Sequence, residues 1–290
     1  MKRPQLLVAL ALAAVSCIPA TAQQNPVTAR QLIKRIQDHI GIPWQSQTVD
    51  TFKAGNPDAP VTGIAVTMMA TFDVLQRAAA SGKNLVITHE PTVYNHLDKT
   101  ADLESRNDAV LAAKQAFIRD HNLIVWRFHD HWHARKPDGI LLGMTRALGW
   151  VDYENPNDAR LFNLPEITLE KLAENVRTKL NIRVLRVVGD SRMKLTKVAF
   201  LPGAAGSDRQ MQLLERDDVE ALLIGETPEW ETVEYVADAV SEHKRKALVI
   251  LGHIPSEQAG MAECALWLRS FIKEVPIEFV PAAEPFWRPK

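Results

Sequence analysis

The chain has 290 residues, of which 46% are hydrophobic and 24% charged, the composition of an ordinary globular protein with one large or two modest domains. The formal charge of −1 gives no basic surface for phosphate backbones, which argues against nucleic acid as a partner. Beyond residue 22 no apolar run is long enough to span a bilayer, so no membrane span is expected.

Residues 1–22 are expected to be an export signal. A basic start precedes the apolar run 6–15, which is too short to cross a bilayer with ease, and Ala20-Thr21-Ala22 is an A-x-A cleavage site. A lipid anchor at Cys17 is the alternative. Cleavage after Ala22 would leave Cys264 as the one cysteine, so an internal disulfide is excluded. The protein is therefore predicted to be exported, to the periplasm.

Alternating helix and strand patterns continue along the rest of the chain. Helical spacing of apolar residues predicts helices over 28–40, 71–80, 105–120, 140–148, 168–180, 231–243 and 256–272. Short apolar runs predict strands over 61–68, 84–88, 123–128, 184–188, 197–201, 219–224, 247–252 and 277–280. Short strand–helix–strand connections favour right-handed crossovers and parallel pairing. The predicted class is α/β, with two domains and mostly parallel sheets.

The most polar stretch, residues 152–158, predicts a domain boundary. Residues 27–150 together with 245–290 are expected to form a metal-binding α/β domain. Residues 151–244 are expected to form a second α/β domain.

Three of the buried runs end on a histidine. Residues 84–88 lead into His89, residues 123–128 into His129, and residues 247–252 into His253. Ligands in open α/β sheets bind beyond the carboxyl ends of the strands. Imidazoles delivered to that edge by three strands predict a metal site there.

Each histidine motif also carries a carboxylate. Pro91 keeps Glu90 out of helical geometry, so His89 and Glu90 are expected on an extended strand end, with a surface loop as the alternative. His253 and Glu257 are four residues apart across a helix start and can converge on one point. The alternative for Glu257 is that it merely caps that helix.

The tract from His129 to His133 contains three imidazoles and Asp130. Neutral imidazoles are ready ligands for zinc, manganese, iron or nickel, whereas a solvated polar loop is the alternative. In an extended chain the three histidines would share one face and Asp130 would take the other.

Two further features are weaker. Glu226 follows the strand 219–224 and is a candidate for proton transfer or for support of a ligand, although a helix start rich in acids also explains it. Ser207 is expected to cap a helix that follows the small residues from Pro202.

These motifs resemble the Nif-three-like family, also described as dinuclear metal-centre hexameric proteins or GTP cyclohydrolase I type 2-like proteins. The resemblance runs from about residue 56 to the C-terminus, and its most specific match is Gly-His-x-x-x-Glu at residues 252–257. Glu90 stands where the family has the second histidine of His-His-Pro, and His133 where it has a ligand aspartate. The resemblance implies two α/β domains and a homo-oligomer, for which the family's toroidal hexamer is one form.

The resemblance also implies the ligand set. The residues that would hold metal are His89, Glu90, His133, His253 and Glu257, with Asp130 and His129 in reserve. The two exchanged ligands put the metal preference and the number of ions in question, so one or two divalent transition metals (Zn, Mn, Fe or Ni) are expected.

The expected activity is metal-assisted hydrolysis of a small-molecule substrate, with water activated by the ions and protons moved by Glu226. GTP cyclohydrolase activity follows from the family label alone, and GTP is scarce outside the cytoplasm. One alternative is a non-catalytic exported assembly that binds or carries metal. Another is a degenerate member of the family that uses only the fold.

Overall fold

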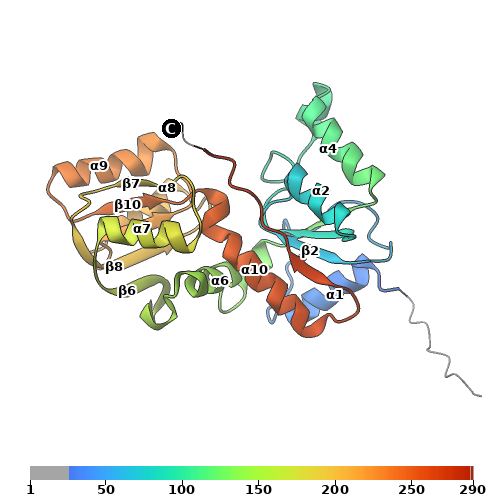
Figure 1. Ribbon diagram of the computed structural model, residues 1–290, viewed down its shortest axis with the longest axis horizontal. Helices are drawn as coiled ribbons and strands as arrows, with labels where there is room; N and C mark the ends of the chain where they lie inside the picture. The colour runs from blue at the N-terminus through green and yellow to red at the C-terminus, as the bar shows by residue number, and fades with distance from the viewer. Residues whose placement is uncertain (1–25, 288, 290) are drawn as a thin grey trace, which may run out of the picture.

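The computed structural model describes residues 26–287 and 289, and it contains two β-sheets with helices packed on them (Figure 1). We call the part built on the first sheet the first domain and the part built on the second sheet the second domain. The predicted mixed α/β class is confirmed. The predicted export signal, with Cys17, lies outside the described residues.

The first sheet has the order β1-β4-β3-β2-β11. Its strands are β1 (Phe52–Ala54), β2 (Ile64–Thr67), β3 (Leu85–Thr88), β4 (Ile124–Arg127) and β11 (Ile277–Phe279). Pairing is parallel from β4 to β11, and β1 is an antiparallel edge strand. The residues of β2, β3 and β4 are all buried, as expected for central parallel strands with both faces covered.

The second sheet has the order β5-β6-β8-β9-β10-β7. Its strands are β5 (Glu154–Asn155), β6 (Asp158–Thr168), β7 (Arg186–Val188), β8 (Lys194–Leu201), β9 (Ala221–Ile224) and β10 (Ala247–Ile250). The centre, β8-β9-β10, is parallel, and the outer pairs are antiparallel. The polar stretch at 152–158 is therefore a hairpin that opens this sheet, and β6 is a strand that the sequence patterns did not predict.

The helices of the first domain include α1 (Ala29–His39), α2 (Phe72–Ala80), α3 (Ala101–Ser105), α4 (Ala109–Asp120) and α5 (Asp130–Ala134). The helices further along the chain are α6 (Gly139–Leu148), η1 (Val151–Tyr153), α7 (Leu169–Lys179), α8 (Ser207–Leu214), η2 (Glu229–Val233), α9 (Glu234–Ser241) and α10 (His253–Phe271). Local signals fix several ends: Thr28 and Gln31 form a capping box on α1, and Gly149 ends α6 in the left-handed conformation.

One strand lies in a different sheet from the one that the expected domain boundary at residue 245 implies. Strand β10, predicted for the first domain, pairs in parallel with β9, so that Leu248 lies beside Leu222 in the second sheet. The reason is local, because β9, α9 and β10 form a strand–helix–strand unit, and consecutive strands of such a unit usually pair. The chain returns to the first domain only along α10, which leads to β11 beside β2.

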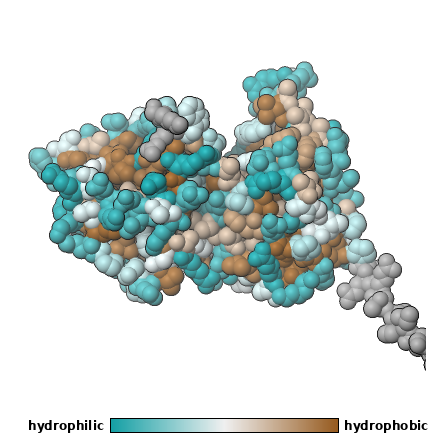
Figure 2. Space-filling view, viewed as in Figure 1, coloured by the Kyte–Doolittle hydropathy of each residue, from teal (hydrophilic) through white to brown (hydrophobic). Residues whose placement is uncertain are grey.

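Helices α6 and α10 connect the domains and pack against each other (Figure 1). A Cβ atom added to Gly143 would lie 2.4 Å from the carbonyl oxygen of Ala259, and one added to Gly260 would lie 2.5 Å from the Cα of Ile140. Only glycine allows this close approach of two helix backbones. Figure 2 shows tan and brown, mostly apolar, side chains at the joint between the domains.

Among the residues that the structure describes, no helix combines the length and the apolar character needed to cross a membrane.

Candidate metal centre

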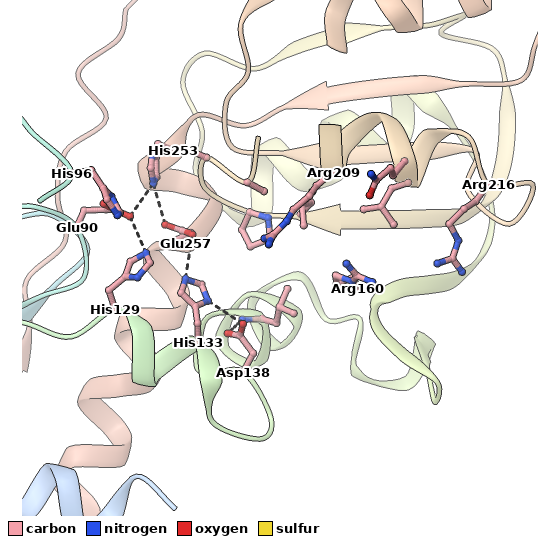
Figure 3. Close-up of a pocket in the computed structure, with 17 residues that line it drawn as sticks. Glu90, His96, His129, His133, Asp138, Arg160, Arg209, Arg216, His253 and Glu257 are labelled. Atoms are coloured by element: carbon pink, nitrogen blue, oxygen red, sulfur yellow. Dashed lines mark hydrogen bonds and ion pairs between the residues drawn. The ribbon is translucent and has the colours of Figure 1, made fainter. Parts of the chain in front are cut away.

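The predicted ligands meet between the two domains (Figure 3). His89 and Glu90 follow β3, and His129 and His133 follow β4. Helix α10 contributes His253, its first residue, and Glu257. Within the described residues two groups offer ligand atoms that all lie within 4.8 Å of one another. They are His89, His129 and His133, and His89, Glu90 and Glu257. The third histidine-ending strand thus reaches the site from the second sheet rather than as a neighbour of the other two.

His89 has the protonation state of a metal ligand. It is fully buried, and its Nδ1 donates a hydrogen bond to the carbonyl oxygen of Phe128 at 3.1 Å. Burial, followed by the charges of His129 and His133, holds the pKa of His89 well below its ordinary value. The ring is therefore neutral, and the lone pair on Nε2 faces the cluster.

Two buried atoms in the cluster have no hydrogen-bond partner among the described residues. They are Nε2 of His89 and Oε2 of Glu257, which lie 3.8 Å apart; Oε2 also lies within ion-pair distance of Nε2 of His253, at 3.3 Å, without a hydrogen bond. An unsatisfied buried polar atom costs about 1–3 kcal/mol, and an ion is one recognised explanation for it. Imidazole nitrogen and carboxylate oxygen together suit a divalent transition metal such as zinc, manganese, iron or nickel. The residues present therefore fit the metal that the sequence implies.

Glu90 contributes a carboxylate that stays ionised. Its Oε1 lies 3.3 Å from Nε2 of His253 and 3.6 Å from Nε2 of His129, and its Oε2 lies 3.4 Å from Arg127. Burial raises the pKa of Glu90, but the hydrogen bond with His253 and the charges of His253, His129 and Arg127 outweigh it, so that the pKa falls to about 2. Glu90 is thus a permanent anion at the domain boundary.

The tract that follows β4 is helical, which corrects the expectation of an extended chain. Asp50 accepts hydrogen bonds from the backbone N–H groups of His129, at 2.6 Å, and of His131, at 2.9 Å, and so caps the start of α5. Residues four apart lie on one face of a helix, which directs both His129 and His133 toward the cluster. The capping residue is about 80 positions away in sequence, so no local pattern could reveal it.

Asp130 lies behind His129 rather than among the facing ligand atoms. Its Oδ1 is 2.9 Å from Nδ1 of His129, and its Oδ2 accepts hydrogen bonds from the hydroxyl of Thr48 and the backbone N–H of Val49. The hydrogen bond from His129 lowers the pKa of Asp130. A carboxylate in this position fixes the ring and its tautomer.

Asp138 holds His133 in the same way, at 3.0 Å between Oδ2 and Nδ1. Burial lowers the pKa of His133, but the hydrogen bond and charge of Asp138 outweigh burial and raise it. The other oxygen of Asp138 accepts from the backbone of Ile140 and Leu141 and caps α6. Sequence patterns did not single out Asp138, although an aspartate directly before a helical pattern is a capping signal.

His131, the middle histidine of the tract, points away from the cluster. Its Nδ1 is 2.7 Å from Asp50, its Nε2 accepts from the backbone N–H of Gln45 at 2.9 Å, and its ring stacks on Trp44. Both nitrogens are used, so His131 supports the packing around β4 rather than offering a ligand atom.

His253 lies among three carboxylates. Its Nε2 is 3.3 Å from both Glu90 and Glu257, and its Nδ1 is 3.4 Å from Glu226. Burial lowers the pKa of His253, but its contacts with the carboxylates of Glu226, Glu257 and Glu90 outweigh burial and raise it to about 12. Without an ion, the protonated ring of His253 supplies the positive charge between these carboxylates. A metal ligand must be a neutral ring, so His253 would lose this proton on binding an ion, and the ion would supply the positive charge.

Glu226 lies next to His253, on the side of its Nδ1 atom, and this contact is compatible with either of its two expected roles. It is an exposed residue, and the hydrogen bond with His253 lowers its pKa, so it is a carboxylate that can accept a proton. It also lines a cavity of about 520 Å³ with His253, Phe72 and Tyr94.

The loop after β8 passes directly against Glu257. A Cβ atom on Gly203, whose φ is +66°, would lie 2.4 Å from Oε1 of Glu257. The backbone N–H of Gly203 donates to Ser256 at 3.0 Å. The expectation that Ser207 caps α8 was wrong, because Gly206 occupies the capping position and Ser207 is the first helical residue.

A larger cavity opens on the other side of the cluster, with a volume of about 860 Å³. Glu90, His129, His133, His253 and Glu257 line it at one end. Arg160, Arg209 and Arg216 line it further along (Figure 3). A small molecule in this cavity would contact the ligand cluster.

Comparisons with known proteins agree with this architecture. The family described as Duf34/NIF3 (NGG1p interacting factor 3) matches residues 27–285. A GTP cyclohydrolase 1 type 2 homolog of Clostridium acetobutylicum is 25% identical over 214 residues, which cover 70% of this chain and 75% of that protein. A protein of the same name from Campylobacter jejuni is 20% identical over 78% of this chain and 83% of its own length.

Solved structures show the same fold. A hypothetical protein of Staphylococcus aureus superposes with a TM-score of 0.72 at 17% identity, covering 91% of this chain and 100% of that one. A Bacillus cereus protein related to NIF3 gives a TM-score of 0.69 at 14% identity, covering 90% and 99%. Because the family match spans nearly all of the described residues, the chain belongs to the Duf34/NIF3 (NGG1p interacting factor 3) family.

Proposed function

We propose that the protein is an exported metal-dependent hydrolase whose centre lies between the two domains. The observation that carries this proposal is the convergence of two buried ligand atoms without a hydrogen bond, Nε2 of His89 and Oε2 of Glu257, in a cluster that lines one end of an open cavity. Two relatives of this chain are named GTP cyclohydrolase 1 type 2 homologs, so GTP belongs among the substrates to be tested.

The two ligand groups support one or two ions. His89 belongs to both groups, but a neutral imidazole has a single free lone pair, so it serves one ion at a time. A carboxylate can serve two ions, and the two oxygens of Glu257 face different histidines: Oε1 lies 3.9 Å from His133 and Oε2 lies 3.3 Å from His253. Glu257 would therefore be able to offer a ligand oxygen to an ion in either position.

A divalent transition metal would supply Lewis-acid activation of water and of the substrate near neutral pH. The protein's own side chains supply the rest. Asp130 and Asp138 hold the rings of His129 and His133, and Glu226, a carboxylate beside His253, accepts a proton. The cavity admits a small-molecule substrate next to the cluster, which favours catalysis over storage of metal.

The export signal and a homo-oligomeric state, for which the hexamer is one form, complete the proposal. Cleavage after Ala22 is checked by mass spectrometry of the protein recovered from the periplasm. Light scattering of the purified mature chain checks the oligomer.

The deciding experiment combines metal analysis with activity. Purified protein is expected to hold one or two equivalents of metal and to hydrolyse at least one member of a panel of phosphoesters, cyclic amidines, amides and GTP. Full metal occupancy without turnover of any substrate would contradict the hydrolase and leave the metal-carrying alternative. His253→Ala is expected to lose metal, whereas His121→Ala, an exposed histidine at the end of α4, is the matched control. Retention of all metal by His253→Ala would contradict the site.

A further inference from the structure

Resting on the proposed function, we propose that Arg209 recognises an oxyanion of the substrate, a phosphate or a carboxylate separated from the bond that reacts at the metal centre. The substrate class is then a small molecule with the reacting group at one place and an anionic group at another.

The three arginines of the larger cavity differ in their partners. Arg160 makes a fork-shaped pair with Asp158, with contacts of 2.9 and 2.8 Å. Arg216 makes the same kind of pair with Asp218, with two contacts of 2.8 Å, and also lies 3.6 Å from Asp158. Their charges are already balanced by these aspartates.

Arg209 has no such balance. Within residues 26–287 and 289 no carboxylate lies within ion-pair distance of its guanidinium, although it lines the cavity. Figure 3 shows Arg209 projecting from α8 into the space between the ligand cluster and the other two arginines. This exposed, unpaired guanidinium, which lines the same cavity as the ligand cluster, is therefore open to a ligand.

The backbone that carries Arg209 is fixed relative to the cluster. The adjacent residue, Gln210, is fully buried; its Nε2 donates to the carbonyl oxygen of Glu226 at 3.0 Å, and its Oε1 accepts from Thr232 at 2.7 Å. Glu226 in turn contacts His253. Because these contacts link α8 to Glu226 and through it to His253, the backbone at Arg209 has a fixed position relative to the cluster.

The chemistry of the cavity selects an anion. A guanidinium keeps its charge at any working pH and matches the two oxygens of a carboxylate or phosphate with parallel N–H donors. The wall of the same cavity also includes Leu201, Pro202 and Leu213, which suit an uncharged spacer. A ligand with an anion at one end and a group for the metals at the other satisfies both regions.

Matched probes test this inference on the zinc-loaded full chain by calorimetry. Propane-1,3-diphosphonate is compared with propylphosphonate, and glutarate with butyrate, so that each pair differs by one anion. The two-anion member of one pair is expected to bind more tightly, and that pair identifies the oxyanion. Arg209→Ala is expected to weaken the affinity for the two-anion probe by roughly 10- to 100-fold, while the affinity for the one-anion probe changes by less than about twofold. Arg209→Lys, which keeps the charge but not the fork, falls between.

The control is Arg192→Ala, an arginine that is 89% exposed and outside the cavity, and it is expected to change neither affinity. Equal affinities within both probe pairs, or no effect of Arg209→Ala, would overturn the inference. Zinc content is measured on the same samples. A wild-type chain without zinc contradicts the proposed metal centre, and the effect of Arg209→Ala on diphosphonate binding by that metal-free chain then decides the anion site separately.

Discussion

The two domains position their histidines differently. In the first domain the rings are oriented by hydrogen bonds to neighbouring groups, whereas the histidine at the end of the second sheet is positioned by the carboxylates around it. The Nδ1 atoms of His89, His129 and His133 are each bonded to a group close by in the first domain or just beyond α5. His253, which begins α10 at the end of the second sheet, is instead surrounded by carboxylates, of which Glu90 comes from the first domain.

This difference shows how an ion would couple the domains. The first-domain ligands are positioned whether or not an ion is present, since their partners are backbone and aspartate groups. Glu90 and His253 face each other across the boundary, and their present attraction depends on the proton that His253 carries. An ion that replaces this proton would take over the link between β3 and α10.

The largest effect is expected from His89→Ala, because His89 belongs to both ligand groups. The variant should lose more of its tightly bound metal than His129→Ala, because without His89 each group keeps two of its three ligands, whereas His129→Ala removes a member of one group only. Metal per chain, measured by plasma mass spectrometry after dialysis against a weak chelator, checks the difference. Equal metal contents in the two variants would show that the two groups are not the units of binding.

A smaller effect is expected from the aspartates that hold the first-domain rings. Asp130→Ala and Asp138→Ala should each weaken metal binding about 10- to 100-fold, because the rings lose their orientation. Asp138→Ala also removes the cap of α6 and should cost about a further 1 kcal/mol of stability. Chelator competition measures the affinity, and thermal unfolding of the metal-free variants measures the cap. Unchanged affinity in both variants would mean that the rings are held by packing alone.

Much of the fold followed from sequence because its signals are local. Buried apolar runs identified the central strands, and Gly252-His253 with Glu257 marked the start of α10, although the helix begins three residues earlier than expected. The edge strand β1 and the long strand β6 were missed, since β1 has only three residues, all half-buried, and exposed residues interrupt the apolar pattern of β6.

The remaining features of the site depend on contacts between distant residues. Asp50, about 80 positions away in sequence, makes the tract after β4 helical. The helical geometry points the buried His131 away from the cluster and places Asp130 behind His129. The pairing of β10 with β9 moved one histidine motif into the second sheet. The capping by Asp50 leaves no mark in the local spacing that sequence patterns measure, whereas the strand–helix–strand order of β9, α9 and β10 is itself a local signal for this pairing.

The smallest predicted effect on metal affinity concerns Glu257, the ligand candidate that lies against the loop after β8 in the second domain. Gly203→Ala would place a Cβ atom 2.4 Å from Oε1 of Glu257, so the carboxylate must move, and metal affinity should fall about tenfold while the first-domain ligands stay in place. Gly82→Ala is the matched control, because Gly82 has a similar φ of +71° but no neighbouring atom within 4 Å of an added Cβ. Both variants pay the backbone strain of a positive φ, about 1 kcal/mol or more. Chelator competition should therefore separate them although thermal unfolding of the metal-free proteins does not. If Gly203→Ala kept the wild-type affinity, Glu257 would not be held in place by the second domain, and the two halves of the centre would not differ as described.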